Sequence, residues 1–214
     1  MSVSVSTSWF GRLGWVVGLL LMLGGCTSEK DRLEGIAKTA ATARPAAATA
    51  LRNAFYAKQI TVNAALDMAH ERVNPEPPPG GGPARTPTAG DIAFAGAVLD
   101  FIEQVEPDIK GKILNDFFWI RVGTLAGNAA AAAKAGGDDQ LAASLVLAGP
   151  PTWQKMDLYW RQCPSHDALA SILLFQTGRE KEALSRLNER PDLPDEVQQA
   201  KEMIEREMKK RPRK

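Results

Sequence analysis

Residues 108–137 read DIKGKILNDFFWIRVGTLAGNAAAAAKAGG, and this stretch decides the fold class. Its large apolar residues cover most of a helical circumference, and Ala129–Ala133 continues the pattern with small side chains. A helix that is apolar nearly all round belongs in the middle of a core. Gly136 and Gly137 then end it. We predict a central helix from about Asp108 whose core residues are Ile113, Leu114, Phe117, Phe118, Ile120, Val122 and Leu125.

Helix-start signals divide the chain before this stretch. Ser28 and Asp31 form a capping-box pattern, which predicts a helix to about Ala43. Pro45 suits the first turn of a second helix, because the missing N–H is unneeded there. Thr61 is placed to cap a third helix.

The third helix should turn Leu66 inward and Glu71 and Arg72 outward. Thr88 begins a further helix, whose apolar residues recur at helical spacing up to Val105. Pro107 is expected to end or reset that helix, because proline removes a backbone donor.

Residues 74–87, NPEPPPGGGPARTP, interrupt this series of helices. Proline clashes with a preceding helical turn, so the segment cannot be helical. It consists of a semi-stiff polyproline piece followed by a flexible glycine joint. It either links two helical sections, residues 26–73 and 88–211, or forms a long surface loop.

The same signals continue after the central stretch. Short helices are predicted over Gln140–Ala148 and Glu180–Asn188. Thr152 should cap a helix and Ser165 the next one. The first of these carries Trp153, Met156, Tyr159 and Trp160, and the last helix carries Val197, Ala200, Ile204 and Met208 on one face. No stretch alternates with a period of two, so the predicted class is all-α, with antiparallel helical hairpins.

The hairpin around Gly178 resembles a tetratricopeptide repeat. Phe175–Gly178 is followed by Ala183 and Leu187, as in that family's turn and second helix, although Asp167 and Ser171 replace the usual Trp and Gly. Weaker echoes occur at Ala135-Gly136-Gly137 and at Ala57-Lys58-Gln59. Their spacing departs from the family period of about 34 residues. Degenerate repeats and an irregular helical bundle both remain open at this point.

The sequence Leu23-Gly24-Gly25-Cys26 follows an apolar run, Leu13–Leu23, and a single charge, Arg12. The run is shorter than the roughly 20 apolar residues of a membrane-spanning helix and is typical of a signal peptide. This arrangement resembles the lipobox of bacterial lipoproteins. The resemblance implies that residues 1–25 are removed and that Cys26 carries the lipid. An uncleaved anchor or an ordinary secretory signal would use the same residues.

The residue after Cys26 is Thr27, and it is not the Asp that retains enterobacterial lipoproteins at the inner membrane. The family pattern therefore implies the outer membrane, with the protein facing the periplasm. If Cys26 carries lipid, Cys163 has no partner for a disulfide within the chain.

Loss of residues 1–25 would remove one charge, Arg12, and bring the formal net charge from +1 to zero. A general nucleic-acid binder would show a basic excess, so we expect no nucleic-acid partner. The basic residues from Lys209 to Lys214 have two interpretations. They complement a helix C-terminus and continue into a solvated end, residues 212–214, or they contact anionic headgroups or an acidic partner.

Cys163 and His166 are the best candidates for chemistry. Their spacing offers two zinc ligands, whereas a structural zinc site needs four. A Cys/His nucleophile pair would need an orienting group such as Asp167. A simpler interpretation makes Ser165 a helix cap and His166 an exposed first-turn residue.

Other candidates are weaker. His70-Glu71 lacks the second histidine of a zinc-protease helix, and Asp138 and Asp139 suit a helix start. The aromatic residues are interpreted as core: Phe118, Trp119, Trp153, Tyr159 and Trp160. We therefore predict no catalytic residue, no metal, no cofactor and no enzyme activity.

Three functional hypotheses follow. The first is an envelope lipoprotein, held by membrane lipid through Cys26, whose helical domain binds another protein. The second is an envelope enzyme or small-ligand-binding protein with a pocket near Cys163, His166 and Trp160. The third is a lipoprotein with a purely structural role. An exposed apolar groove between hairpins would favour the first hypothesis, a protein-binding lipoprotein. A deep polar cleft that gathers His166, Asp157 and Asp167 would favour the second, an enzyme or ligand-binding protein.

Overall fold

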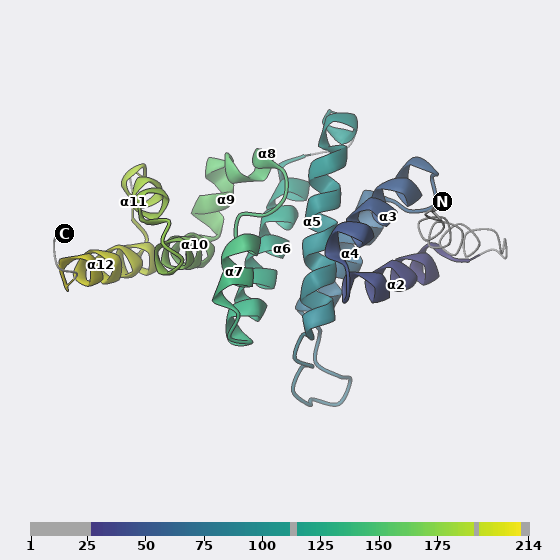
Figure 1. Cartoon of the computed structure of the whole chain (residues 1–214), viewed down its shortest axis with the longest axis horizontal. Helices are drawn as coiled ribbons and strands as arrows, with labels where there is room; N and C mark the ends of the chain where they lie inside the picture. The colour runs from purple at the N-terminus through teal and green to yellow at the C-terminus, as the bar shows by residue number, and fades with distance from the viewer. Residues whose placement is uncertain (1–26, 112–114, 191–192, 211–214) are drawn as a thin grey trace, which may run out of the picture.

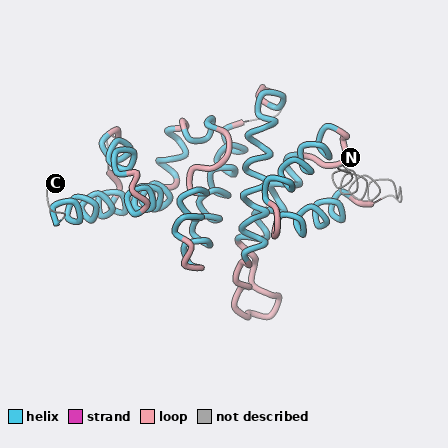
Figure 2. Tube along the Cα trace, viewed as in Figure 1, coloured by secondary structure: helices cyan, strands magenta, loops and turns pink. Residues whose placement is uncertain are grey.

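The computed structural model describes residues 27–111, 115–190 and 193–210. Within those ranges the chain is built from helices and contains no strand, so the predicted all-α class is confirmed. The helices form an elongated row that runs from α2 at one end to α12 at the other (Figures 1 and 2). The elements are α2 (Glu29–Ala40), α3 (Arg44–Tyr56), α4 (Val62–Val73), α5 (Ala89–Ile109), α6 (Asp116–Ala135), α7 (Asp139–Leu145), α8 (Pro151–Gln154), α9 (Asp157–Gln162), α10 (Pro164–Gln176), α11 (Glu180–Asn188) and α12 (Asp195–Lys210).

The predicted caps of the first helices are confirmed. Ser28 and Asp31 form a reciprocal capping box at the start of α2, which ends at Ala40 and so before Ala43. The Thr61 hydroxyl accepts the Ala64 N–H, which starts α4. These side chains satisfy backbone donors that have no partner within the first turn of a helix.

Helices α5 and α6 lie at the centre of the row. Helix α5 packs against α2, α3, α4 and α6, and α6 continues the contact to α7 and α8. Phe94, Phe101 and Leu99 of α5 are completely buried, as are Val122 and Leu125 of α6. One continuous core extends from α2 to α10, and a second, smaller apolar cluster joins α10, α11 and α12.

Three turns share one backbone geometry. In α3–α4, α6–α7 and α10–α11 the turn contains one residue in the left-handed region: Lys58 (φ 56°), Gly137 (φ 83°) and Gly178 (φ 86°). In each turn this residue's N–H bonds to the carbonyl three residues back, and the next N–H bonds five residues back. These are Schellman-type helix ends. They fall at the three places where the sequence echoes a tetratricopeptide turn.

The end of α5 and the start of α6 differ from the prediction. Helix α5 runs through Pro107 to Ile109, because a proline in the last turn removes few bonds before the helix ends. Helix α6 begins later than predicted, where the Asn115 side chain accepts the Phe118 N–H. Phe117, predicted to be core, is 66% exposed. The predicted core residues Ile113 and Leu114 lie outside the described residues.

The region of Trp153 also differs. It forms two short helices, α8 and α9, in place of the single predicted helix, and Thr152 lies inside α8 without capping it. Pro164 occupies the first turn of α10, so Ser165 lies within that helix and is not its cap. Proline at a first turn starts a helix without a side-chain cap.

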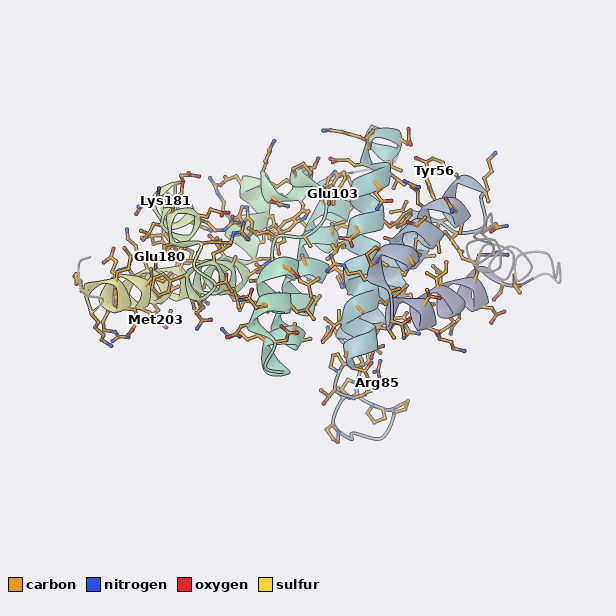
Figure 3. All side chains as sticks on the ribbon, viewed as in Figure 1. Tyr56, Arg85, Glu103, Glu180, Lys181 and Met203 are labelled. Carbon is orange, nitrogen blue, oxygen red and sulfur yellow. The ribbon has the colours of Figure 1, made fainter. Side chains whose placement is uncertain are left out.

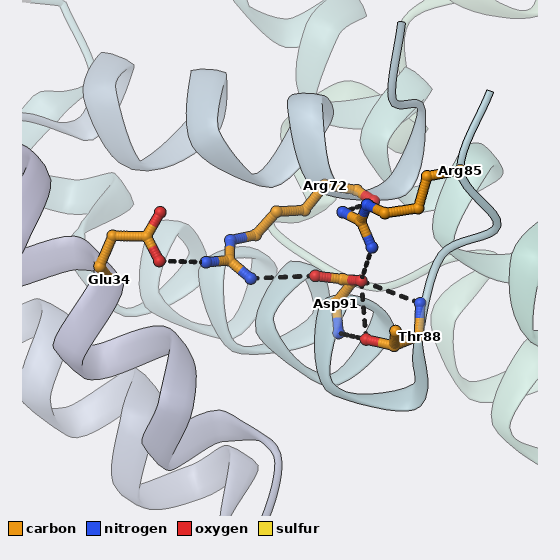
Figure 4. Close-up of polar contacts among 5 residues, drawn as sticks. All are labelled: Glu34, Arg72, Arg85, Thr88 and Asp91. Carbon is orange, nitrogen blue, oxygen red and sulfur yellow. Dashed lines mark hydrogen bonds and ion pairs between the residues drawn. The ribbon is translucent and has the colours of Figure 1, made fainter. Parts of the chain in front are cut away.

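Residues 74–87 form a loop between α4 and α5, two helices that pack against each other (Figure 1). The base of this loop is held by Asp91, which is buried in the first turn of α5 (Figure 4). Asp91 accepts hydrogen bonds from Arg72 (2.9 Å), from Arg85 (2.6 Å) and from the hydroxyl and N–H of Thr88. Arg72 also pairs with Glu34 of α2, so it does not simply face solvent as predicted.

Among the described residues, no helix is both long enough and apolar enough to cross a membrane. The predicted signal peptide, Cys26 and the basic end at residues 212–214 lie outside the described residues.

Candidate functional site: an apolar groove at the ends of α3, α4, α5 and α6

His166 is a buried structural residue, which corrects the expectation of an exposed one. Only 7% of it is exposed. Its Nε2 donates to the Val146 carbonyl (2.8 Å), and so its Nδ1 accepts from the Tyr159 hydroxyl. Burial lowers the pKa of His166 to about 4, although the Val146 contact opposes this shift. The imidazole is therefore neutral at physiological pH and has both nitrogens occupied.

Cys163 is half-buried next to this histidine. Burial raises the pKa of its thiol, and hydrogen bonds with Tyr159 and Thr124 only partly offset that effect. A nucleophilic cysteine needs a lowered pKa. Cys163 and His166 line a small cavity of about 340 Å³ with Gln162 and Ser165. The surroundings of the pair thus favour packing over nucleophilic chemistry.

Asp167 anchors a separate buried ion-pair network. Its carboxylate accepts from Arg186 (2.7 Å) and from Arg190. The Arg186 guanidinium lies 3.8 Å above the Trp160 ring, and Arg190 donates to the Trp160 carbonyl. Asp167 is only 1% exposed, and this network ties α11 to α9 and α10. A buried, fully paired carboxylate of this kind serves packing and orientation.

A polar cleft of about 650 Å³ opens beside this network. Asp157 and Asp167 both line it, together with Lys155, Arg186 and Arg190. His166 does not line this cleft, because its ring faces Tyr159 and Val146. The combination expected of an enzyme site, with His166 between the two carboxylates, is therefore not assembled.

The weaker candidates also have structural roles. His70 contacts the Arg121 carbonyl (2.9 Å), and burial lowers its pKa. Asp138 caps α7 by accepting the Leu141 N–H. No group of three or more His, Cys, Asp or Glu side chains within the described ranges could hold a metal ion. Trp153, Tyr159 and Trp160 pack with His166 into one aromatic cluster, as expected for core residues.

An apolar groove of about 680 Å³ lies at the ends of α3, α4, α5 and α6. Its apolar lining consists of Phe55 and Tyr56 from α3, Ile60 and Val62 around the turn, Ile109 from α5 and Phe118 from α6. Polar residues form the rest of its wall: Lys58, Thr61, Asn63 and Asp108. The Tyr56 hydroxyl donates to Asp108 (2.5 Å), which holds the ring across the end of the groove.

Exposed aromatic side chains mark the same face. Three large hydrophobic residues of the described chain are strongly exposed: Tyr56 (54%), Phe117 (66%) and Leu158 (41%). Tyr56 lines the groove, and Phe117 lines a neighbouring hollow of about 360 Å³ that shares Asn63 and Phe118 with it. Exposed apolar surface that gathers in one place is typical of an interaction site. Figure 3 shows Tyr56 at one edge of the molecule, near the end of α3.

The groove lies close to the start of the described chain. The Glu29 carboxylate, in the first turn of α2, accepts the N–H of Thr61 (2.6 Å). Glu29 follows Cys26 by three residues, which span at most about 11 Å when fully extended. A lipid on Cys26 would therefore hold the groove near the membrane surface.

The groove could not be recognised from the sequence. Phe117 and Phe118 both look like core residues of the central helix, and Tyr56 lies on the apolar stripe of a different helix. The available signal was two adjacent aromatic pairs, Phe55-Tyr56 and Phe117-Phe118, each at a helix end. Neighbouring residues on a helix point in different directions, so both rings of a pair cannot face the core equally. The exposed rings are Tyr56 in the first pair and Phe117 in the second.

Comparison of the chain with protein-family models, with curated proteins and with solved structures finds no match. Function is therefore inferred from the residues and their geometry alone.

Proposed function

We propose that this chain is a bacterial envelope lipoprotein, anchored through acylated Cys26, whose helical domain binds another protein through the apolar groove. The observation that carries this proposal is the groove itself, with its exposed Tyr56 and the adjacent Phe117. Aromatic side chains supply large contact area at interfaces. The lipobox-like sequence at Leu23–Cys26 supports the anchor.

The position of the groove supports the link between anchor and binding. One acyl chain holds a protein only marginally, whereas several chains together give stable attachment. A stably anchored domain presents the groove near the outer-membrane surface that faces the periplasm. Its partner would then be another protein of the envelope. The buried hydrogen bonds of His166, the raised pKa of the Cys163 thiol and the ion pairs of Asp167 support a binding role over catalysis.

The anchor is tested by growing cells with labelled palmitate. Wild type should incorporate label and fractionate with membranes, and Cys26→Ser should lose both. A wild-type chain that takes no lipid and fractionates as soluble would refute the anchor.

The groove is tested by placing a photo-crosslinking amino acid at Phe117 in cells, with the same amino acid at Leu158 as control. Both side chains are exposed, but Leu158 does not line the groove. A discrete protein adduct from position 117 that disappears on adding Tyr56→Ser supports the groove. Equal adducts from both positions would refute it.

A further inference from the structure

The groove and the proline-rich loop both leave surface of the described chain open to a partner. Residues 76–81 are exposed along their whole length, and the loop that contains them projects from the body of the molecule (Figure 1). The loop is nevertheless well positioned. Asp91 holds Arg85 at its base, and the Gly81 N–H donates to the Pro78 carbonyl (3.2 Å).

The chemistry of this loop suits binding in the polyproline conformation. Consecutive prolines favour that helix, which has no internal hydrogen bonds. Apart from the Pro78 carbonyl, which accepts the Gly81 N–H, carbonyls in that conformation remain available as acceptors, and ordering costs little entropy. Grooves lined by aromatic residues are a recurring binding site for such segments.

The groove has the matching features. Phe55, Tyr56 and Phe118 provide aromatic surface for proline rings. Asn63 on the wall carries an amide that can donate to these carbonyls, whereas the Thr61 hydroxyl already donates to Glu29. The described residues contain no strand, so pairing with an extended peptide along a sheet edge is not available here.

The charges at the two surfaces are complementary. Lys58 is exposed on the wall of the groove and makes no ion pair with any residue that the structure describes. Glu76 is exposed directly before Pro77 and likewise has no ion-pair partner in the described ranges. A bound loop would bring one unpaired cation and one unpaired anion to the same interface.

The loop cannot enter the groove of its own molecule. Figure 3 places Tyr56 at one long edge and Arg85, at the base of the loop, at the opposite edge. We propose that the proline-rich loop of one copy of this chain, residues 75–79, binds in the apolar groove of a second copy. This rests on the proposed function, because it names the protein that the groove binds.

Such a contact joins two different surfaces and so is head-to-tail. Copies anchored side by side in one membrane would bring the loop of one next to the groove of its neighbour. The result is a chain or ring of copies in the plane of the membrane. Each contact is small and therefore weak, and the high local concentration on a membrane would favour it.

The test uses the full chain in phosphatidylcholine vesicles and a fluorescent synthetic peptide of residues 73–84, read by anisotropy. We expect saturable binding to wild type, at least tenfold weaker binding to Tyr56→Ser, and unchanged binding to Leu158→Ser. A peptide with Pro77, Pro78 and Pro79 all replaced by Ala should bind at least tenfold more weakly. Absence of binding, or binding that Tyr56→Ser leaves unchanged, overturns the proposal.

A second measurement does not depend on the peptide. In a Cys163→Ser background, vesicles holding a mixture of Lys58→Cys and Glu76→Cys chains should form disulfide-linked pairs of the two variants under mild oxidation. Vesicles holding either variant alone should form far fewer. Equal amounts of dimer in all samples would argue against this contact.

The two proposals fail in different ways. If the photo-crosslinker at Phe117 captures a different protein and the peptide does not bind, the groove still binds protein and the second copy is wrong. If that crosslinker reacts only with lipid, neither proposal about the groove holds, whereas the anchor at Cys26 is judged by the palmitate experiment alone.

Discussion

Replacement of Asp91 by Asn should destabilise the protein by about 1–3 kcal/mol, because this carboxylate joins α2, α4, α5 and the loop. The Asp91 side chain is 4% exposed and faces two arginines. Hydrogen bonds to charged groups contribute about 1.5–3 kcal/mol each. Asn keeps one acceptor oxygen for Thr88, but its amide group would point at a guanidinium.

The exposure of the two arginines limits the loss. Arg85 is half exposed, so water replaces most of its bond and its share is at most about 1 kcal/mol. Arg72 is 23% exposed and keeps Glu34, so its bond accounts for the remaining 1–2 kcal/mol. These two contributions give the estimate.

The assay is urea unfolding followed by circular dichroism. With a slope of about 2 kcal/mol per molar urea, the midpoint of Asp91→Asn should fall by about 0.5–1.5 M. Asp157→Asn is the matched control, since Asp157 is 70% exposed in its pair with Arg161 and should shift the midpoint by less than about 0.25 M. Equal midpoints for wild type and Asp91→Asn would show that the network contributes no net stability.

Three further predictions concern protonation and packing. Burial would raise the pKa of Asp91, but the hydrogen bonds from Arg85, Thr88 and Arg72 outweigh burial and lower the pKa to about 2. The stability that the Asp91 carboxylate contributes should therefore be lost as the pH falls from about 4 to 2. Over this pH range the urea midpoint of wild type should drop more than that of Asp91→Asn. The His166 pKa of about 4 lies below the ordinary value of 6.5, so NMR should show a neutral ring from pH 8 to 5. The stability linked to this neutral ring should fall as the pH drops from 6.5 to 4. A ring that titrates near pH 6.5 would contradict its burial. Gly123→Ala places a Cβ 2.5 Å from the Tyr159 ring and should lower the free energy of unfolding in urea by about 1–3 kcal/mol. Gly35→Ala, whose Cβ would have nothing within 4 Å, should be neutral or stabilising by up to about 1 kcal/mol. Similar midpoints for both variants would refute the packing argument.

Local sequence signals identified most of the helices. The Ser28–Asp31 box, the Thr61 cap and the Gly178 turn act through residues a few positions apart, and the structure has each of them. The all-α class follows from the same signals, because helical spacing is a local property of the chain. The predicted range Glu180–Asn188 agrees with α11 residue for residue.

Local signals failed where packing from distant residues decides the outcome. His166 occupies a first turn, which is usually exposed, yet the Val146 carbonyl lies twenty positions away in the chain and covers it. Trp153 and Tyr159 share an apolar stripe, yet they belong to two short helices that both pack on Gly123 of α6. Phe117 is as apolar as Phe118, but adjacent residues of a helix point in different directions, and in α6 only Phe118 reaches the core.

The groove shows the same division between local and tertiary information. Apolar patterns in the sequence predict that Tyr56 and Phe118 are helix residues on apolar faces. Which apolar side chains remain partly uncovered depends on how the ends of α3, α5 and α6 meet. The end of α3 is more than fifty positions from the end of α5 in the sequence. Helix formation is governed by contacts within one or two turns, whereas a binding surface is formed by the apolar area that remains exposed once all the helices have packed.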